Sequence, residues 1–339
     1  MRGRFLTGRD MSSQTPAIGD FFVCDIFAAS PKSDLGSMEH PFFSLATRPD
    51  RTIRHYAHNG VTVTVTPSVR GRATIHDKDI LIYCISQLVA ALNAGRTISR
   101  RLTLTAHDLL VATRRDTGGD SYARLREAFE RLAGTRITTN LTTGPADDPV
   151  EVTTGFGLIE GWEIVRRTRG GRMVSVSVTL SDWLYRAVQA RSVLTLSRDY
   201  FGLRKPLERR VYELARKHCG NQREWRIGIG TLHHKAGSDA PVRVFRAAIR
   251  RMIAADTLPD YALSEDPGDI LRVTRRRLVE EVAGLPPFGA EVLEAARAAA
   301  PGWDVHALEA EWRAFWASSG RPRLTKPDKA FLGWLRGRV

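Results

Sequence analysis

The chain has 339 residues, 42% of them hydrophobic and 26% charged, which is typical of a globular protein with room for two or three domains. No stretch approaches the roughly 18 consecutive apolar residues of a membrane span. The N-terminus is charged and lacks the apolar segment of a secretory signal. We therefore expect a cytoplasmic protein without a membrane partner.

Positive charge dominates the surface chemistry, because 51 lysines and arginines face 37 acidic residues and the formal net charge is +14. Such an excess destabilises a compact fold unless a polyanion neutralises it. Nucleic acid is the usual polyanion, and anionic lipid is the alternative. Residues 197–277 alone hold 18 Lys or Arg against 10 Asp or Glu. That concentration favours a binding surface.

The first half of the chain predicts strands, then helices, then strands. Residues 1–20 are expected to form a mobile leader, and 21–74 to be extended, with V-T-V-T-V-T alternating after the turn signal Asn59-Gly60. Apolar periodicity predicts helices over 77–94, 105–113 and 120–133, and strand signals follow at 136–141, 155–165 and 173–180. Three helices and a long hairpin are the layout of a winged-helix domain.

The second half repeats that layout. After a linker helix at 181–190, helices are predicted at 206–218, in the second half of 225–237, and at 240–255, before strands at 260–264 and 269–274. An Ala- and Trp-rich end predicts three more helices. The fold class is therefore α+β, two winged-helix DNA-binding domains in tandem plus a small C-terminal helical segment. The predicted divisions are 1–20, 21–180, 181–196, 197–280 and 281–339.

The third helix of each unit is the predicted reader of DNA. In the helix at 241–255 the predicted buried side consists of Phe245, Ile249, Met252 and Ile253. Arginines line the other side, and their planar fork can pair with guanine or with phosphate. A solvated charged face is the alternative interpretation. The candidates on these two helices are Arg124, Arg126, Arg131, Arg243, Arg246 and Arg250.

Further cations are expected to contact phosphates, which would strengthen binding broadly and weaken it with salt. One group lies on the helix at 206–218, opposite an apolar stripe that begins at Leu207, and consists of Lys205, Arg209, Arg210, Arg216 and Lys217. The second group lies at predicted wing turns and consists of Arg169, Arg172, Arg275 and Arg276. These turns could equally be solvated loops.

Catalytic and metal-binding patterns are weak. Three widely separated cysteines, Cys24, Cys84 and Cys219, argue against a disulfide framework and a zinc cluster. The adjacent His233 and His234 point about 100° apart on a helix and cannot chelate one ion together. No phosphate loop and no histidine triplet of a nickase occur. We expect a non-enzyme without cofactor or metal.

Several phrases, in order, resemble those of the replication initiator protein A family of theta-type plasmids. The resemblance covers roughly residues 20–280. The matching phrases are S-M-E-H-P-F-F-S-L at 37–45, A-T-I-H-D-K-D-I-L-I-Y-C at 73–84, R-I-T-T-N at 136–140, T-G-F-G-L-I-E at 154–160, V-T-L-S-D-W-L at 178–184 and L-T-L-S-R-D-Y-F-G-L-R-K-P-L-E-R-R-V-Y-E-L-A-R-K-H-C-G at 194–220.

The resemblance implies two winged-helix domains that bind repeated sites in double-stranded plasmid origin DNA. It also implies that the protein helps open the duplex, recruits host replication proteins (an initiator or helicase), and represses its own gene as a homodimer. Two alternatives stay open: a DNA-binding repressor without initiator activity and, less favoured, a DNA-nicking enzyme.

Overall fold

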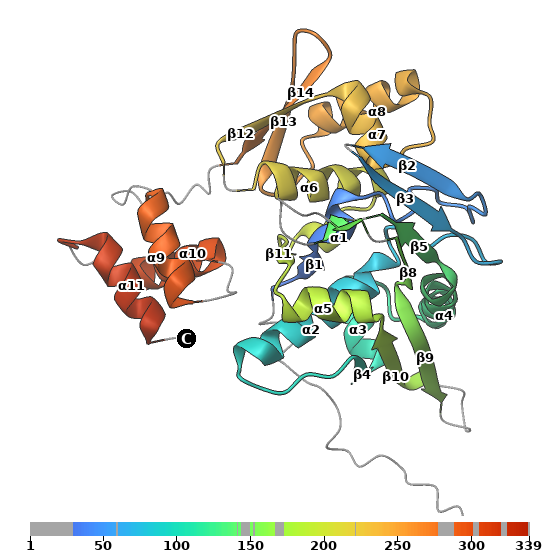
Figure 1. Cartoon of the computed structure of the whole chain (residues 1–339), viewed down its shortest axis with the longest axis horizontal. Helices are drawn as coiled ribbons and strands as arrows, with labels where there is room; N and C mark the ends of the chain where they lie inside the picture. The colour runs from blue at the N-terminus through green and yellow to red at the C-terminus, as the bar shows by residue number, and fades with distance from the viewer. Residues whose placement is uncertain are drawn as a thin grey trace, which may run out of the picture.

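The computed structural model describes residues 30–58, 60–140, 142–143, 150–151, 153–166, 173–220, 222–276, 288–300, 305–319 and 324–337 (Figure 1). The predicted leader at 1–20 lies outside the described residues. So do Arg169 and Arg172. The fold is a mixed α and β architecture.

The first part of the chain builds two larger sheets around a buried helix and a further sheet of two short strands. Its strands are β1 (Lys32–Asp34), β2 (Arg54–His58), β3 (Val61–Thr66), β4 (Arg101–Leu104), β5 (Arg136–Thr139), β6 (Thr142–Thr143), β7 (Val150–Glu151), β8 (Thr154–Gly157), β9 (Ile159–Arg166) and β10 (Met173–Leu180). Its helices are α1 (Leu35–Glu39), α2 (Lys78–Asn93), α3 (Ala106–Ala112) and α4 (Gly119–Gly134). The sheets run β2-β3-β5-β8 and β4-β10-β9.

The structure confirms the predicted helices of this part as α2, α3 and α4. Two expectations are wrong: helix α1 lies within 21–74, which was expected to be extended, and the strand expected at 155–165 is divided into β8 and β9 of different sheets. In β3 the period of two places Val63 and Val65 in the core. Helix α2 is buried along the predicted line of Ile80, Cys84 and Leu88, and also at its polar start, because other elements cover it. Strand β4 is one element that the sequence analysis missed.

The predicted linker helix is α5 (Asp182–Gln189), and it belongs to the core. Ser181 caps it by accepting a hydrogen bond from the Leu184 N–H at 3.3 Å. Leu184 and Val188 are fully buried in the first apolar cluster. The following β11 (Val193–Thr195) pairs with β1, so this segment returns the chain to its first described strand.

The second part repeats the helix–strand–helix–helix–strand–strand order of α2, β4, α3, α4, β9 and β10, without the strands β5 to β8 that the first part inserts between α4 and β9. Its elements are a 3₁₀ turn η2 (Tyr200–Gly202), α6 (Pro206–His218), β12 (Glu224–Gly228), α7 (Ile229–Ala236), α8 (Val242–Ala255), β13 (Tyr261–Asp266) and β14 (Ile270–Arg275). Its sheet runs β12-β14-β13, as β4-β10-β9 does in the first part. In Figure 1, α6 lies between this sheet and the region of α1, β1 and β11.

The C-terminal helices α9 (Ala290–Ala299), α10 (Val305–Ser318) and α11 (Pro327–Arg336) form a separate apolar cluster. At its centre the rings of Phe288 and Phe331 stack 4.9 Å apart beside Trp312. The three predicted helices are therefore confirmed. None of the helices in the described parts of the chain is both long and apolar enough to cross a membrane.

Candidate nucleic-acid interface

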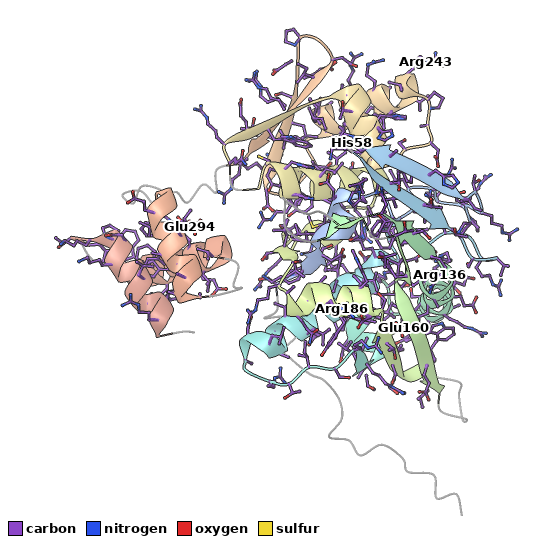
Figure 2. All side chains as sticks on the ribbon, viewed as in Figure 1. His58, Arg136, Glu160, Arg186, Arg243 and Glu294 are labelled. Carbon is purple, nitrogen blue, oxygen red and sulfur yellow. The ribbon has the colours of Figure 1, made fainter. Side chains whose placement is uncertain are left out.

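Helix α8 presents its N-terminal turn to solvent. Phe245, Ile249 and Met252 are buried, as the spacing predicted. In the first turn of the helix Arg243 is exposed, and Val242 and Val244 on either side of it in the sequence keep 40% and 44% of their surface accessible. Figure 2 shows Arg243 at the periphery of the molecule. Exposed valines beside an arginine suit a surface that reads base edges, because apolar side chains contact thymine methyl groups and arginine contacts guanine.

Arg246 and Arg250 do not point freely into solvent. The Arg246 guanidinium donates to both carboxylate oxygens of Asp269 at 2.6 and 2.7 Å. Arg250 donates in the same way to Glu265 at 2.9 and 2.8 Å. The hydrogen bonds from these guanidiniums lower the pKa of both carboxyl groups. The two arginines therefore brace the β13–β14 hairpin against α8, and a phosphate would have to displace a carboxylate to reach them.

Arg243 differs from its two neighbours. No carboxylate of the described residues lies within ion-pair distance of it, so its fork is available to a ligand. Val244 and Arg251, one heptad apart, form a second exposed column that the sequence analysis missed. The signal that could have found it is an apolar residue on the polar side of the helix.

Helix α4, the counterpart of α8, is less open than predicted. Arg124 is exposed, and Arg126 pairs with Glu130 at 3.3 Å. Arg131 donates to both oxygens of Asp77 at 2.7 and 2.8 Å, and its side chain is only 16% exposed. The Asp77 hydrogen bond raises the pKa of Arg131. Arg131 thus joins α4 to the start of α2, and we correct its placement on the DNA-facing side.

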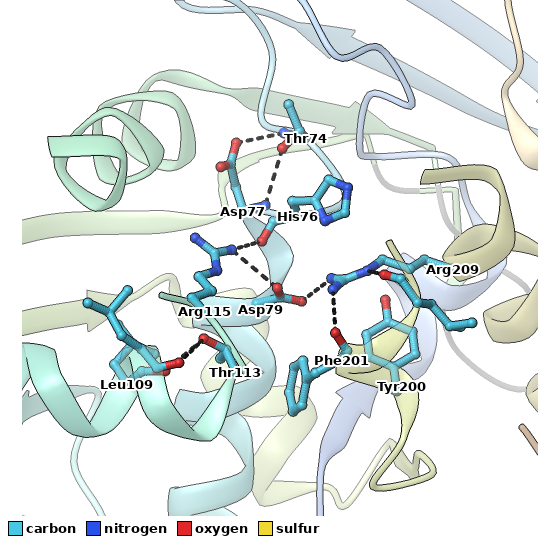
Figure 3. Close-up of polar contacts among 12 residues, drawn as sticks. Thr74, His76, Asp77, Asp79, Leu109, Thr113, Arg115, Tyr200, Phe201 and Arg209 are labelled. Carbon is cyan, nitrogen blue, oxygen red and sulfur yellow. Dashed lines mark hydrogen bonds and ion pairs between the residues drawn. The ribbon is translucent and has the colours of Figure 1, made fainter. Parts of the chain in front are cut away.

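The expectation that Arg209 and Arg210 lie on a wet face of α6 is wrong, because both residues are buried, with 2% and 3% exposure. The Arg209 Nε donates to the Leu203 carbonyl at 2.7 Å, and its Nη1 pairs with Asp79 of α2. Asp79 also accepts from Arg115 at 3.2 Å (Figure 3). Arg209 therefore connects the second part of the chain with the first.

Arg210 is surrounded by main-chain oxygens. Its guanidinium donates to the carbonyls of Met38 at 2.9 Å, Glu39 at 3.0 Å and Lys235 at 2.7 Å. One turn on, Glu213 accepts from Lys78 of α2 at 2.7 Å, and both side chains are 1% exposed. A phosphate therefore cannot reach the guanidinium of Arg210 or the ammonium group of Lys78 in this fold. Arg209 and Arg210 thus form the buried polar part of the junction between α6 and the elements α1 and α2.

The remaining candidates have mixed surroundings. Lys205 is 69% exposed beside Glu208, whereas Lys217 contacts Glu39 at 2.5 Å with 26% of its side chain exposed. Arg216 donates to the Thr195 carbonyl at 2.7 Å. Arg276 pairs with Asp256, and Arg275 also has an interaction within the protein. Of this group, Lys205 is the cation most available to a phosphate.

The described residues include no cluster of potential metal ligands and no exposed thiol. Among them no group of three His, Cys, Asp or Glu side chains is arranged to hold a metal ion. Cys84 and Cys219 are free and buried. Burial raises the pKa of Cys84 to about 12, which keeps the thiol protonated.

The chain is similar in sequence and in fold to known proteins. The sequence profile of the family described as replication initiator protein A matches residues 32–263. A protein of Wigglesworthia glossinidia brevipalpis that bears the name "putative replication protein" is 38% identical over 247 residues, covering 72% of this chain and 88% of that protein. The crystal structure of domains 2 and 3 of RctB superposes with a TM-score of 0.51 at 11% identity, covering 72% of this chain and 96% of that one.

At that identity the likeness to RctB concerns the fold alone. The profile match extends from β1 into β13 and so covers α6, α8 and the junction between the two parts. Together with the 38% identical relative, it identifies the chain as a member of the replication initiator protein A family.

Proposed function

We propose that this replication initiator acts by binding repeated sites in the double-stranded DNA of a plasmid origin. In this proposal the two repeated units are winged-helix domains, with α4 and α8 as recognition helices and the β9–β10 and β13–β14 hairpins as wings. The order of elements and the matching strand orders support that assignment. The protein would bind DNA without cutting it and would recruit host replication proteins, either an initiator or a helicase.

The observation that carries the proposal is the exposed first turn of α8. Recognition helices contact base edges mainly through their N-terminal residues. Here that turn presents Arg243, which has no ion pair among the described residues, between two valines that are 40% and 44% exposed. Burial of such valines against thymine methyl groups, with Arg243 on guanine, would give sequence preference rather than charge attraction alone.

The ion pairs behind α8 support the same role. Arg246 and Arg250 hold the hairpin to the helix through Asp269 and Glu265. Because these ion pairs already fix the hairpin relative to the helix, less conformational entropy is lost when DNA binds. Positioning of helix and wing is therefore the role that we assign to these two arginines, and base reading is assigned to Arg243.

A footprint on the non-coding DNA of the plasmid, at near-physiological salt, tests the proposal. We expect protection of a tandem set of repeats. Protection of a single inverted repeat at the protein's own promoter would favour a dimeric repressor without initiator activity. Diffuse protection that salt abolishes would leave only non-specific charge attraction. A supercoiled plasmid incubated with magnesium should stay uncut, which separates binding from nicking.

A further inference from the structure

A groove of about 810 Å³ lies between β8 and α5. Its floor and walls come from the β8 residues Thr154–Gly157, from Trp183 and Ala187 of α5, and from Gly36 of α1. We call this surface the β8 groove. Neither α8 nor the β13–β14 hairpin contributes to it. Of the other proposed recognition helix and wing, only Ala133 at the end of α4 and Ile159 and Glu160 at the start of β9 line it.

Strand β8 is the end strand of the β2-β3-β5-β8 sheet. One edge pairs with β5, from Arg136 opposite Gly157 to Thr139 opposite Thr154. No strand of the described residues pairs with the other edge. An open edge presents N–H and C=O groups that can accept an additional strand. Gly155 is exposed and carries no side chain that would keep another backbone away, whereas Gly157 is buried, so the exposed part of this edge is Thr154 and Gly155.

An aromatic wall stands beside this edge. The ring of Trp183 stacks on Phe156 of β8 with the centroids 4.5 Å apart and the planes at 10°. Trp183 also fits closely over Gly36, where a Cβ would come within 2.5 Å of the ring. The tryptophan is therefore held in place from two sides, yet it remains only half-buried. It offers a fixed apolar surface to a side chain that enters the groove.

One cation of the groove is unneutralised. The carboxylates at the rim are engaged by arginines of the chain, Glu160 by Arg100 at 3.3 Å and Asp182 by Arg186 at 2.7 Å. Arg136 is exposed and has no ion pair among the described residues. Its Nη1 would lie 3.1 Å from a Cβ built on Gly157, so the guanidinium lies over β8. The places of Arg136, Glu160 and Arg186 on the molecule can be followed in Figure 2.

We propose that the β8 groove binds an extended acidic peptide segment of a host replication protein. The peptide would add as a strand to the open edge of β8, pack an apolar side chain against Trp183 and place a carboxylate on Arg136. A nucleic-acid strand fits less well, because its phosphodiester backbone has no N–H donors for the strand's carbonyl groups. The identity of the partner rests on the proposed function, whereas the groove and its peptide chemistry do not.

The test uses a displayed library of random peptides about 12 residues long, a length that spans the groove as a strand, selected on the full chain. We expect enriched peptides to combine an acidic residue with alternating apolar residues. A synthetic enriched peptide should bind Arg136→Glu about tenfold more weakly or worse, because the peptide carboxylate would face a like charge in place of the guanidinium. Ala187→Trp, which fills the groove, should bind as weakly. Arg48→Glu, the same charge change at an exposed arginine outside the groove, should bind like the wild type.

A second measurement separates strand addition from other modes. Amide hydrogen exchange over residues 154–157 should slow when the peptide is bound, because the outward N–H groups gain partners. Unchanged exchange there, or equal affinity for Arg136→Glu and wild type, would overturn the proposal. Oligothymidine that slows this exchange in place of the peptide would also overturn it. A chain that footprints origin repeats but selects no such peptide loses this proposal and keeps the proposed function.

Discussion

Arg209 of α6 and Asp79 of α2 are 130 residues apart in sequence and form an ion pair in which both residues are buried. Asp79 is shared with Arg115, and Lys78, the neighbour of Asp79, pairs with Glu213 one turn beyond Arg209. The start of α2 and the middle of α6 are thus joined by alternating charges. This junction fixes how the second part of the chain sits on the first.

Removal of Arg209 should therefore destabilise the protein instead of weakening only DNA binding. Arg209→Ala leaves Asp79 with one cationic partner and Leu203 with an unsatisfied carbonyl, and breaking a buried pair costs about 3–5 kcal/mol. Urea unfolding measures the loss. Arg204→Ala, at an exposed arginine on the same approach to α6, should change the free energy of unfolding by less than about 0.5 kcal/mol. Equal small effects for the two variants would contradict the structural role.

The same helix shows what periodicity can and cannot predict. The apolar stripe of α6 was predicted from spacing, and Val211, Leu214 and Ala215 are fully buried. The opposite side was predicted to be wet because it is cationic, but α1 and the start of α2 cover it. Spacing within one helix carries no information on what a distant segment packs against it. Strand β4 was not predicted because its four residues are too few to show a clear period.

The candidate site was predicted in outline only. The recognition helix α8 and its buried face follow from the sequence, yet the spacing gave equal weight to Arg243, Arg246 and Arg250. Pairing with Asp269 and Glu265 depends on how the hairpin folds back, which becomes visible only in three dimensions. The β8 groove was not predicted at all, because its walls come from segments more than 100 residues apart, such as Gly36 and Trp183.

Arg243→Ala should reduce specific DNA binding more than Arg246→Ala does. We expect a loss of about 1–3 kcal/mol in the ratio of specific to random binding for Arg243, because a base contact would be removed. Arg246→Ala would instead release the hairpin from α8 and weaken specific and random binding to a similar degree. Competition binding with origin and scrambled duplexes at one salt concentration compares the two. A larger specificity loss for Arg246 would reassign the base contact.

Stability should fall as the pH is lowered from about 6.5 to about 4. Burial lowers the pKa of His40 and of His76 to about 4, from 6.5 for an exposed histidine. Between these values the unfolded chain binds protons that the folded chain refuses, so acid favours unfolding. The stabilisation is complete above the unfolded pKa and is lost as the pH falls through the folded pKa.

Thermal melting across that pH range checks this sign. The double variant His40→Asn, His76→Asn should show a shallower decline of the melting temperature than wild type, since two of the proton-linked groups are gone. His107→Asn is the control, because His107 is an exposed histidine outside the core. An unchanged pH slope in the double variant would mean that other groups, such as Glu39, dominate the acid response.

Gly237→Ala should destabilise the protein, whereas Gly230→Ala on the same helix should not. Gly237 ends α7 in the left-handed region with φ of 66°, and a Cβ there would lie 2.4 Å from the Cβ of Pro41. Left-handed backbone costs an L-residue about 1–2 kcal/mol, and a clash with a ring adds to this. A Cβ on Gly230 would meet nothing within 4 Å, and alanine favours a helix interior over glycine by about 0.5–1 kcal/mol. Urea unfolding should therefore give shifts of opposite sign. A Gly237→Ala protein as stable as wild type would show that the contact between α7 and Pro41 can relax, and the packing of α7 against the first part of the chain would then be looser than the distances imply.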